Sequence, residues 1–195
     1  MPQKPPSTTR LEAFSDGVIA VIITVMVLEL KVPHENGIAG FYAILPTLQI
    51  YLLSYAFTGI YWINHQHLLD RTESADHLIL YANLGFLFFL SLLPFSTLYV
   101  IEKNIDSFAV SLYAVSMLLT GFAFLLLRLA IHRSLLRSGD LEHEDNAQRV
   151  KHLASLSLYL LSIPLAFLNA ELALAVIALV TVIWILPNFA IRKRR

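Results

Sequence analysis

The chain has 195 residues, of which 57% are hydrophobic and only 14% charged, and its formal net charge is zero. Soluble domains average about 25% charged residues, so this composition predicts an integral membrane protein. Zero net charge leaves no bulk basic surface, and no nucleic-acid partner is expected. The absence of cysteine excludes disulfides and thiolate chemistry.

The N-terminal segment MPQKPPSTTR is polar and proline-rich. It lacks the apolar core and the small-residue cleavage site of a signal peptide, so residues 1–9 are predicted to be a short retained tail. Thr9 and Glu12 match the S/T-x-x-E capping box, which predicts that the first helix begins near Thr9.

Six apolar runs follow in chain order. Most reach the roughly 20 residues that cross about 30 Å of hydrocarbon. The last two are short and joined by a tight turn at Asn169–Glu171, so we interpret them as a helical hairpin. The sequence predicts an all-α fold, with one transmembrane domain over residues 1–195 and spans at Leu11–Leu30, Gly40–Asn64, His77–Val100, Phe108–His132, His152–Leu168 and Ala170–Leu186.

The distribution of lysine and arginine predicts the orientation in the membrane. Of 14 such residues, only Lys31 and Lys103 fall on one side. The positive-inside rule then places both termini in the cytoplasm, which agrees with an even number of spans. The polar loop 134–151 is predicted to be cytoplasmic too. The twelve lysine and arginine residues predicted on the cytoplasmic side are Lys4, Arg10, Arg71, Arg128, Arg133, Arg137, Arg149, Lys151, Arg192, Lys193, Arg194 and Arg195.

The first predicted helix opens with the charged segment RLEAFSD. A charged side chain inside the hydrocarbon costs about 2.5–3.5 kcal/mol on insertion scales. Arg10 can extend its guanidinium to the headgroups, but Asp16 lies too deep for its short side chain to do so. We therefore expect Ser15 and Asp16 to have a specific polar partner.

The same helix carries a stripe of apolar side chains with a single hydroxyl. At about 100° per residue from Asp16, Thr24, Leu28, Val21 and Val25 fall at about 80°, 120°, 140° and 180°. The aspartate points roughly 130° away from the centre of this stripe. Asp16 is thus directed at a neighbouring helix. The stripe itself is free to face lipid, another helix or a different environment.

The end of the second span, YWINHQHLLDR, supplies candidate partners. Trp62 and His65 are three residues apart, share a helix face, and carry N–H groups suited to a carboxylate. We hypothesise that both hydrogen-bond the Ser15–Asp16 pair and fix the rotation of the first helix. An interfacial belt position is the alternative for Trp62. His65 and His67 form a weak metal motif without further ligands.

The third span carries one amide in an apolar run and ends in LLPFSTLYV. Asn83 is a candidate bridge between helices. Pro94 is predicted to kink the helix.

These motifs resemble the transmembrane protein 175 family, whose signature R-x-x-x-F-S-D precedes an apolar helix. A T-V-M run, a W-x-x-H in the second span and an N…L-L-P-F-x-T pattern in the third also match, and the resemblance covers the whole chain. The matching residues are Arg10, Phe14, Ser15, Asp16, Thr24, Val25, Met26, Trp62, His65, Asn83, Pro94, Phe95 and Thr97. Seven of them are predicted to form a structural polar network: Arg10, Phe14, Ser15, Asp16, Trp62, His65 and Asn83.

The resemblance implies a potassium-permeable channel that lacks a TVGYG filter and assembles as a homotetramer in the cell membrane. First helices line the pore in this family. Bulky apolar side chains form the constriction, which falls on Val21, with Val25 and Leu28 following and Thr24 beside them. The family usually places isoleucine or leucine in that first layer, and the smaller valine here predicts a wider constriction. The implied partners are potassium ions, the lipid bilayer and further copies of this chain, with no cofactor.

Other functions remain open from the residues alone. A secondary transporter would favour broken helices and an inverted repeat, and a proton-leak pathway is a further alternative. A voltage-gated channel would show arginines at every third residue of its fourth helix, which this chain does not. An enzyme is not expected, because the histidine pair is the only catalytic candidate at membrane depth.

Overall fold

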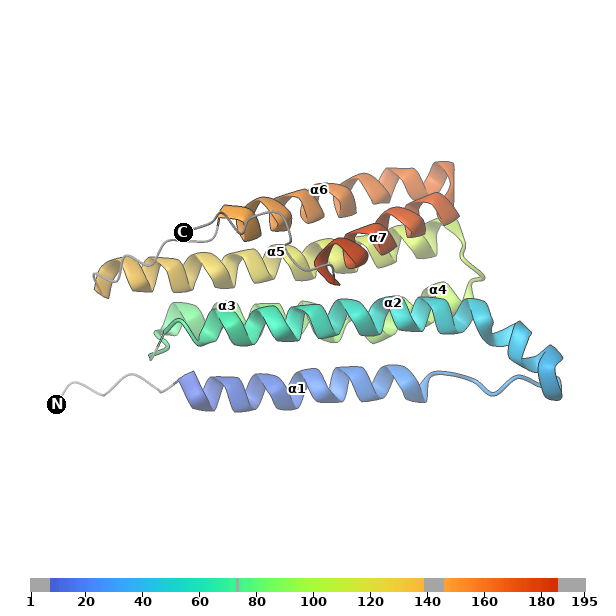
Figure 1. Cartoon of the computed structure of the whole chain (residues 1–195), viewed down its shortest axis with the longest axis horizontal. Coiled ribbons are helices and arrows are strands. Elements are labelled where there is room, and N and C mark those ends of the chain that lie inside the picture. The colour runs from blue at the N-terminus through green and yellow to red at the C-terminus, as the bar shows by residue number, and fades with distance from the viewer. Residues whose placement is uncertain (1–7, 73, 139–145, 186–195) are drawn as a thin grey trace, which may run out of the picture.

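The computed structural model describes residues 8–72, 74–138 and 146–185, and its regular structure in these ranges is helical. The helices run roughly parallel to one long axis, with α1 at one edge of the bundle and α6 at the opposite edge (Figure 1). The elements in chain order are α1 (Thr8–Leu28), α2 (Gly37–Leu69), α3 (His77–Ser91), α4 (Leu93–Glu102), α5 (Ser107–Ser138), α6 (Asn146–Leu168) and α7 (Ala170–Ile185).

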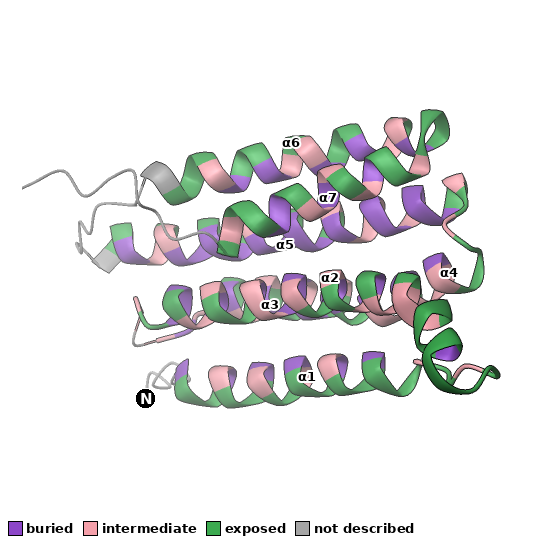
Figure 2. Cartoon of the chain, turned by 45° about the vertical axis from the view of Figure 1, so that its right-hand side comes forward, coloured by how far each residue is buried: buried purple, intermediate pink, exposed green. Residues whose placement is uncertain are grey.

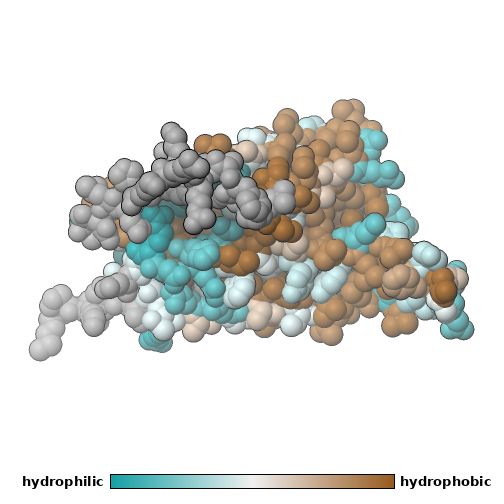
Figure 3. All heavy atoms as spheres, in the orientation of Figure 1, coloured by the Kyte–Doolittle hydropathy of each residue, from teal (hydrophilic) through white to brown (hydrophobic). Residues whose placement is uncertain are grey.

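The prediction of an all-α membrane fold is confirmed. Among the described residues, five helical segments are long and apolar enough to cross a membrane, and α7 is a shorter apolar helix. Each predicted span matches one of these segments, since α3 and α4 together occupy the third. Figure 3 shows hydrophobic residues over much of one face and hydrophilic residues gathered toward the end where α1 begins.

Several helices extend beyond the predicted spans. Helix α2, in the second predicted span, begins at Gly37 and continues to Leu69, past the polar segment that follows Asn64. Helix α5, in the fourth predicted span, continues to Ser138, and α6, in the fifth, begins at Asn146. Both ends of the predicted loop 134–151 are therefore helical. Residues 139–145 of that loop, and 1–7 of the predicted tail, lie outside the described residues.

The predicted kink at Pro94 takes the form of a break between two helices. Helix α3 ends at Ser91, and α4 begins at Leu93 with its proline in the first turn. Proline is tolerated there because the N–H it lacks has no intrahelical partner at that position.

The centre of the bundle is α5, which contacts α3, α4, α6 and α7. Buried residues follow much of its length in Figure 2, whereas α1 is buried along one side and exposed along the other. Tyr113, Met117, Leu127 and Ile131 on α5 are completely buried. The core is thus centred on α5, and α1 contributes one buried face to it.

Candidate functional site

Helix α1 has two distinct faces. Leu11, Ser15, Ile19, Ile22 and Met26 are buried, at the three- and four-residue spacing of a single helix face. This face packs against α2, α3 and α4. The packing fixes which residues of α1 turn outward.

The predicted stripe of Val21, Thr24, Val25 and Leu28 lies on the exposed side of α1. Val21 is 59% exposed and Leu28 is 80% exposed, whereas neighbouring Ile22 is only 4% exposed. We refer to these four residues as the exposed stripe. Its register therefore includes Val21 and excludes Ile22.

The hydroxyl of Thr24 turns back onto its own helix. It donates to the carbonyl oxygens of Ala20 and Val21, each at 3.0 Å. A hydroxyl that donates keeps its oxygen lone pairs as acceptors. The exposed stripe thus presents one oxygen acceptor among apolar side chains.

Asp16 is held by the second helix. Trp62 donates from Nε1 to Asp16 Oδ1 at 2.9 Å. The sequence predicts this pairing, and the structure contains the hydrogen bond. Because the indole belongs to α2, the bond links α1 to its neighbour close to the start of α1.

The expected bond between His65 and the Ser15–Asp16 pair is replaced by a relay through Asn83. His65 Nε2 lies 2.7 Å from Asn83 Oδ1, and Asn83 Nδ2 donates to Ser15 Oγ at 2.9 Å. Ser15 in turn donates to the carbonyl of Leu11 at 2.8 Å. His65 is connected to Ser15 only through Asn83, because the Asn83 side chain of α3 lies between His65 of α2 and Ser15 of α1. We call Ser15, Asp16, Trp62, His65 and Asn83 the polar anchor.

Three members of the polar anchor are fully enclosed. His65 is 1% exposed, and Asn83 and Ser15 are 0% exposed. The imidazole also stacks on Phe86, with ring centroids 5.5 Å apart, while its Nδ1 has no hydrogen-bond partner among the described residues. Buried polar groups are costly unless paired, so this relay fixes how α1, α2 and α3 fit together.

Arg10 and Phe14, which the sequence analysis groups with this network, lie on the opposite side of α1. Both are exposed, Phe14 at 53%. They precede Val21 by eleven and seven residues, which returns them to within about 20° of its direction. The two side chains therefore lie in line with the exposed stripe.

A groove of about 870 Å³, measured out to open solvent, runs between α1 and α2, beside the buried face of α1. Asp16 and Trp62 stand at its polar end, and Ala20, Gly59 and Ile63 are among its apolar lining. The groove leaves the junction of these two helices unfilled by the described residues of the chain.

Two further contacts between elements of the structure are not predicted from the sequence. Ser54 Oγ lies 2.8 Å from Thr97 Oγ1 and 2.7 Å from the Tyr113 hydroxyl, which joins α2, α4 and α5 in the core. Isolated hydroxyl residues are common in membrane helices, so no pattern marks these three. Lys31, after the end of α1, forms an ion pair with Glu102 of α4, and this hydrogen bond raises the pKa of Lys31.

The histidine pair does not form a metal site in the structure. His65 is buried in the polar anchor, whereas His67 is exposed and lines a different cleft. Residues two apart on a helix do not face each other. Within the described residues, no cluster of three or more His, Cys, Asp or Glu side chains could hold a metal ion.

Comparison with known proteins places this geometry in a family. The family model described as "Endosomal/lysosomal potassium channel TMEM175" matches residues 10–94, which include the whole polar anchor. A potassium channel from Chryseobacterium sp. (strain P1-3) is 37% identical over 184 residues, which cover 94% of this chain and 95% of the relative. A potassium channel from Streptomyces collinus is 31% identical over 180 residues, which cover 85% of each chain.

A solved structure shares the fold. The crystal structure of a lysosomal potassium-selective channel TMEM175 homolog from Chamaesiphon minutus matches with a TM-score of 0.78 and 28% sequence identity. The match covers 91% of this chain and 95% of that chain. Since the Chryseobacterium relative is also similar over nearly its full length, this chain belongs to the TMEM175 family.

Proposed function

We propose that this chain is the subunit of a potassium-permeable channel in the cell membrane, with α1 lining the pore. The observation that carries the proposal is the exposed stripe of Val21, Thr24, Val25 and Leu28, which lies opposite the buried face of α1. Relatives named as potassium channels match nearly the full length of the chain. Passive conduction requires no catalytic step and no cofactor.

The proposed assembly is a homotetramer with one copy of α1 from each subunit around a central axis. A closed cyclic assembly uses the same patch of every subunit. Ala13, Gly17 and Ala20 are exposed on α1, and small residues let membrane helices approach closely. The groove between α1 and α2 gives an adjacent subunit a surface to fill.

The proposed orientation has both termini in the cytoplasm. Among the described residues, only Lys31 and Lys103 lie toward the end of the bundle where α1 ends, whereas the others, including Arg10, Arg71 and Arg133, belong to the side where α1 begins. Cytoplasmic loops of membrane proteins carry such an excess. An ion arriving from the cytoplasm would then meet Arg10 and Phe14 before it reaches Val21.

The proposed constriction is a ring of Val21 side chains, followed by Val25 and Leu28. An apolar ring gates by dewetting, and it admits an ion only after part of the hydration shell is lost. Potassium holds its water less strongly than sodium, so partial dehydration favours potassium. The Thr24 oxygen would replace part of the lost shell.

Ion flux from proteoliposomes under potassium and then sodium gradients tests this proposal. We expect passive potassium flux. We also expect Val21→Asn to bring the potassium-to-sodium flux ratio toward one, because a polar ring lets either ion keep more of its water at the constriction. Val27→Asn is the matched control: Val27 is 46% exposed but points about 120° away from Val21.

The outcomes separate the proposed channel from its alternatives. An equal loss of selectivity in Val27→Asn and Val21→Asn would contradict a constriction at Val21. Saturable flux that requires a second, coupled ion would indicate a secondary transporter. Proton flux without potassium flux would indicate a proton-leak pathway.

A further inference from the structure

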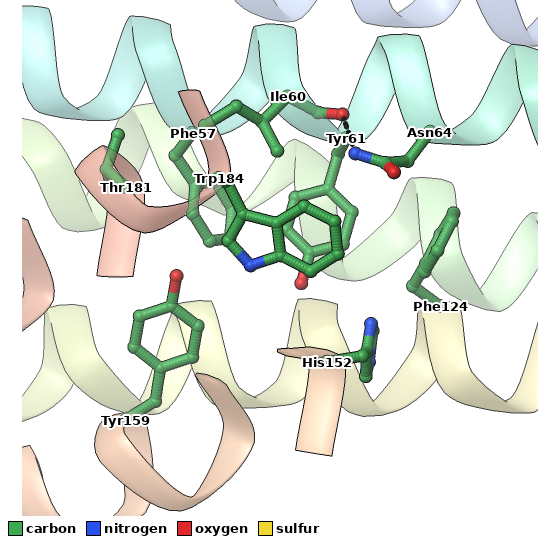
Figure 4. Close-up of a pocket in the computed structure, with 9 residues that line it drawn as sticks. All are labelled: Phe57, Ile60, Tyr61, Asn64, Phe124, His152, Tyr159, Thr181 and Trp184. Atoms are coloured by element: carbon green, nitrogen blue, oxygen red, sulfur yellow. Dashed lines mark hydrogen bonds between the residues drawn. The ribbon is translucent and has the colours of Figure 1, made fainter. Parts of the chain in front are cut away.

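An aromatic recess lies inside the bundle, between α2, α5, α6 and α7 (Figure 4). Its volume is about 310 Å³ measured out to its opening, of which the centre of a water molecule can occupy about 10 Å³. One internal water needs about 10–15 Å³ by the same measure. The recess therefore has room for about one water molecule and is too small for a larger ligand.

Two buried tyrosine hydroxyls point into this recess. Tyr61 of α2 is 9% exposed and Tyr159 of α6 is 3% exposed, and Figure 4 shows both hydroxyls directed into the space beside Trp184. Neither hydroxyl has a hydrogen-bond partner among the described residues. Buried tyrosine hydroxyls usually have one, so these two require a partner that the described part of the chain does not supply.

A third buried tyrosine shows the usual arrangement. Tyr113 of α5 is completely buried, and its hydroxyl lies 2.7 Å from Ser54 Oγ. Tyr113 is not among the residues that line the recess. The two hydroxyls without a partner are thus the two that face open space.

Several polar groups around the recess are engaged with other partners. Tyr61 Oη lies against Gly121 of α5, where an added Cβ would stand 2.9 Å from it. The Gly121 carbonyl accepts a hydrogen bond from His152 Nε2 at 3.0 Å. The indole N–H of Trp184 donates to Ser155 Oγ at 2.8 Å. The recess thus presents the tyrosine hydroxyls with little unoccupied protein.

Two residues of the lining retain an unused acceptor. Asn64 Nδ2 donates to the carbonyl of Ile60 at 2.7 Å, which leaves the amide oxygen of Asn64 as an acceptor (Figure 4). His152 must carry its hydrogen on Nε2, because the Gly121 carbonyl can only accept. Nδ1 of the neutral imidazole is therefore an acceptor. The lining combines two hydroxyl donors with two acceptors.

We propose that the recess binds an internal water molecule, which accepts hydrogen bonds from the hydroxyls of Tyr61 and Tyr159. Internal waters make about two to four hydrogen bonds to polar groups that would otherwise be unsatisfied. Asn64 and His152, which line the same space, carry the acceptors that the hydrogens of this water require. The size of the recess and the chemistry of its lining thus favour the same ligand.

An adjoining cleft gives this water a route to solvent. The cleft and the recess share Asn64, His152 and Trp184 in their linings. The centre of a water molecule can occupy about 40 Å³ of the cleft, which is enough for about three waters. The internal water can therefore exchange with solvent while the bundle stays folded.

The consequence concerns how α2 is held on both of its sides. Tyr61 is adjacent in sequence to Trp62, whose indole donates to Asp16 of α1. The internal water would attach the opposite side of α2 to α6 through Tyr159. Water-mediated hydrogen bonds are nearly as favourable in enthalpy as direct ones, so α2 would have a polar attachment on each side.

Cryo-electron microscopy of the full-length protein in phosphatidylcholine nanodiscs tests the proposal, with water as the probe. In a map that resolves ordered waters, we expect a peak in the recess about 2.5–3.0 Å from the hydroxyl oxygens of Tyr61 and Tyr159. Radiolytic hydroxyl-radical labelling is the second measurement, because radicals formed from bound water modify the side chains beside it. We expect labelling of Tyr61 and Tyr159 but not of Tyr113.

One variant and a matched control locate the water. Tyr159→Phe removes one of the two proposed donors, and it should reduce the labelling of Tyr61 and weaken the peak. Tyr113→Phe removes a hydroxyl that is bonded to Ser54 outside the recess. It should leave the labelling of Tyr61 and Tyr159 unchanged.

Three results would overturn the proposal. The first is a recess without a peak in a map of the unaltered protein that resolves waters elsewhere. The second is a direct hydrogen bond from either hydroxyl to a protein acceptor, and the third is equal labelling of Tyr61 and Tyr113. The map of the unaltered protein keeps the test decisive if Tyr159→Phe fails to fold. None of these readouts measures ion flux, so failure of the proposed channel function would leave the result unaffected.

Discussion

At the scale of single residues, Asn83 is the point where three helices meet. It lies on α3, faces His65 of α2 with its carbonyl oxygen, and donates to Ser15 of α1 with its amide. Because Oδ1 can only accept, His65 must carry its hydrogen on Nε2. The hydrogen bonds therefore run in one direction, from the imidazole to the carbonyl of Leu11.

Replacing Asn83 with leucine should destabilise the protein by about 1–3 kcal/mol, because the buried His65 Nε2 hydrogen loses its acceptor. The double variant Asn83→Leu/His65→Leu should lose less than the sum of the two single variants, since both partners then become apolar. Thermal unfolding of all four proteins in detergent measures the coupling. Strict additivity would mean that His65 and Asn83 do not act together.

Trp62→Phe should cost about 1 kcal/mol, since it removes the indole donor to Asp16 at a partly exposed position. The expected sign is a loss of stability together with greater hydrogen exchange at the start of α1. Tyr55→Phe is the control, because Tyr55 lines the same groove. If Trp62→Phe and Tyr55→Phe leave unfolding equally unchanged, the hydrogen bond contributes nothing to stability.

The sequence identifies the pairing of Trp62 with Asp16 but misses the position of Asn83. Two reasons explain the difference. An aspartate inside an apolar helix requires a donor, and the indole of Trp62 carries one near the same membrane surface. Spacing along one helix shows which side chains share a face, but it does not show which face of a third helix meets them. The relay from His65 through Asn83 depends on that third helix.

At the scale of elements, apolar runs predict where helices cross the membrane but not where they end. Helix α2 continues past Asn64 through His65, Gln66 and His67. Backbone hydrogen bonding favours the helix on both sides of the hydrocarbon boundary, so polarity alone does not stop it. The third span is interrupted at Leu92, between α3 and α4, because Pro94 follows two residues later.

The first turn of α2 depends on one glycine. A Cβ at Gly40 would stand 2.0 Å from the carbonyl oxygen of Glu35, which is backbone and cannot rotate away. Gly40→Ala should therefore lower the unfolding midpoint. Gly85→Ala is its opposite, because nothing lies within 4 Å of that position and alanine favours a helix over glycine by about 0.5–1 kcal/mol. An unfolding midpoint that Gly40→Ala leaves unchanged would contradict the packing described for Gly40.

At the scale of the whole molecule, the subunit is built around α5, and α1 lies at its edge. The sequence predicts the all-α class, the six spans and the family, because composition and the R-x-x-x-F-S-D motif are local properties. The cleft that Arg71 and Arg128 line, between α2, α5, α6 and α7, is not predicted. Arg71 and Arg128 are 57 positions apart in the sequence, and only packing brings them together.

The proposed tetramer predicts a mass of four copies in native mass spectrometry. Ala20 is exposed and lines the groove between α1 and α2, so Ala20→Trp should fill that groove and shift the protein toward smaller assemblies. Ala175→Trp places the same side chain on an exposed position of α7 and should leave the mass unchanged. A persistent monomer in the unaltered protein would contradict the assembly.

The residues that bind α1 to the bundle and those of the exposed stripe are separate sets. Ser15, Ile19, Ile22 and Met26 hold the helix, whereas Val21 and Leu28 contribute little to the interior of the subunit. Mutations in the exposed stripe therefore leave subunit folding largely unaffected. In evolutionary terms, a lineage can explore new permeation properties by changing a few outward side chains, without compensating substitutions elsewhere in the chain.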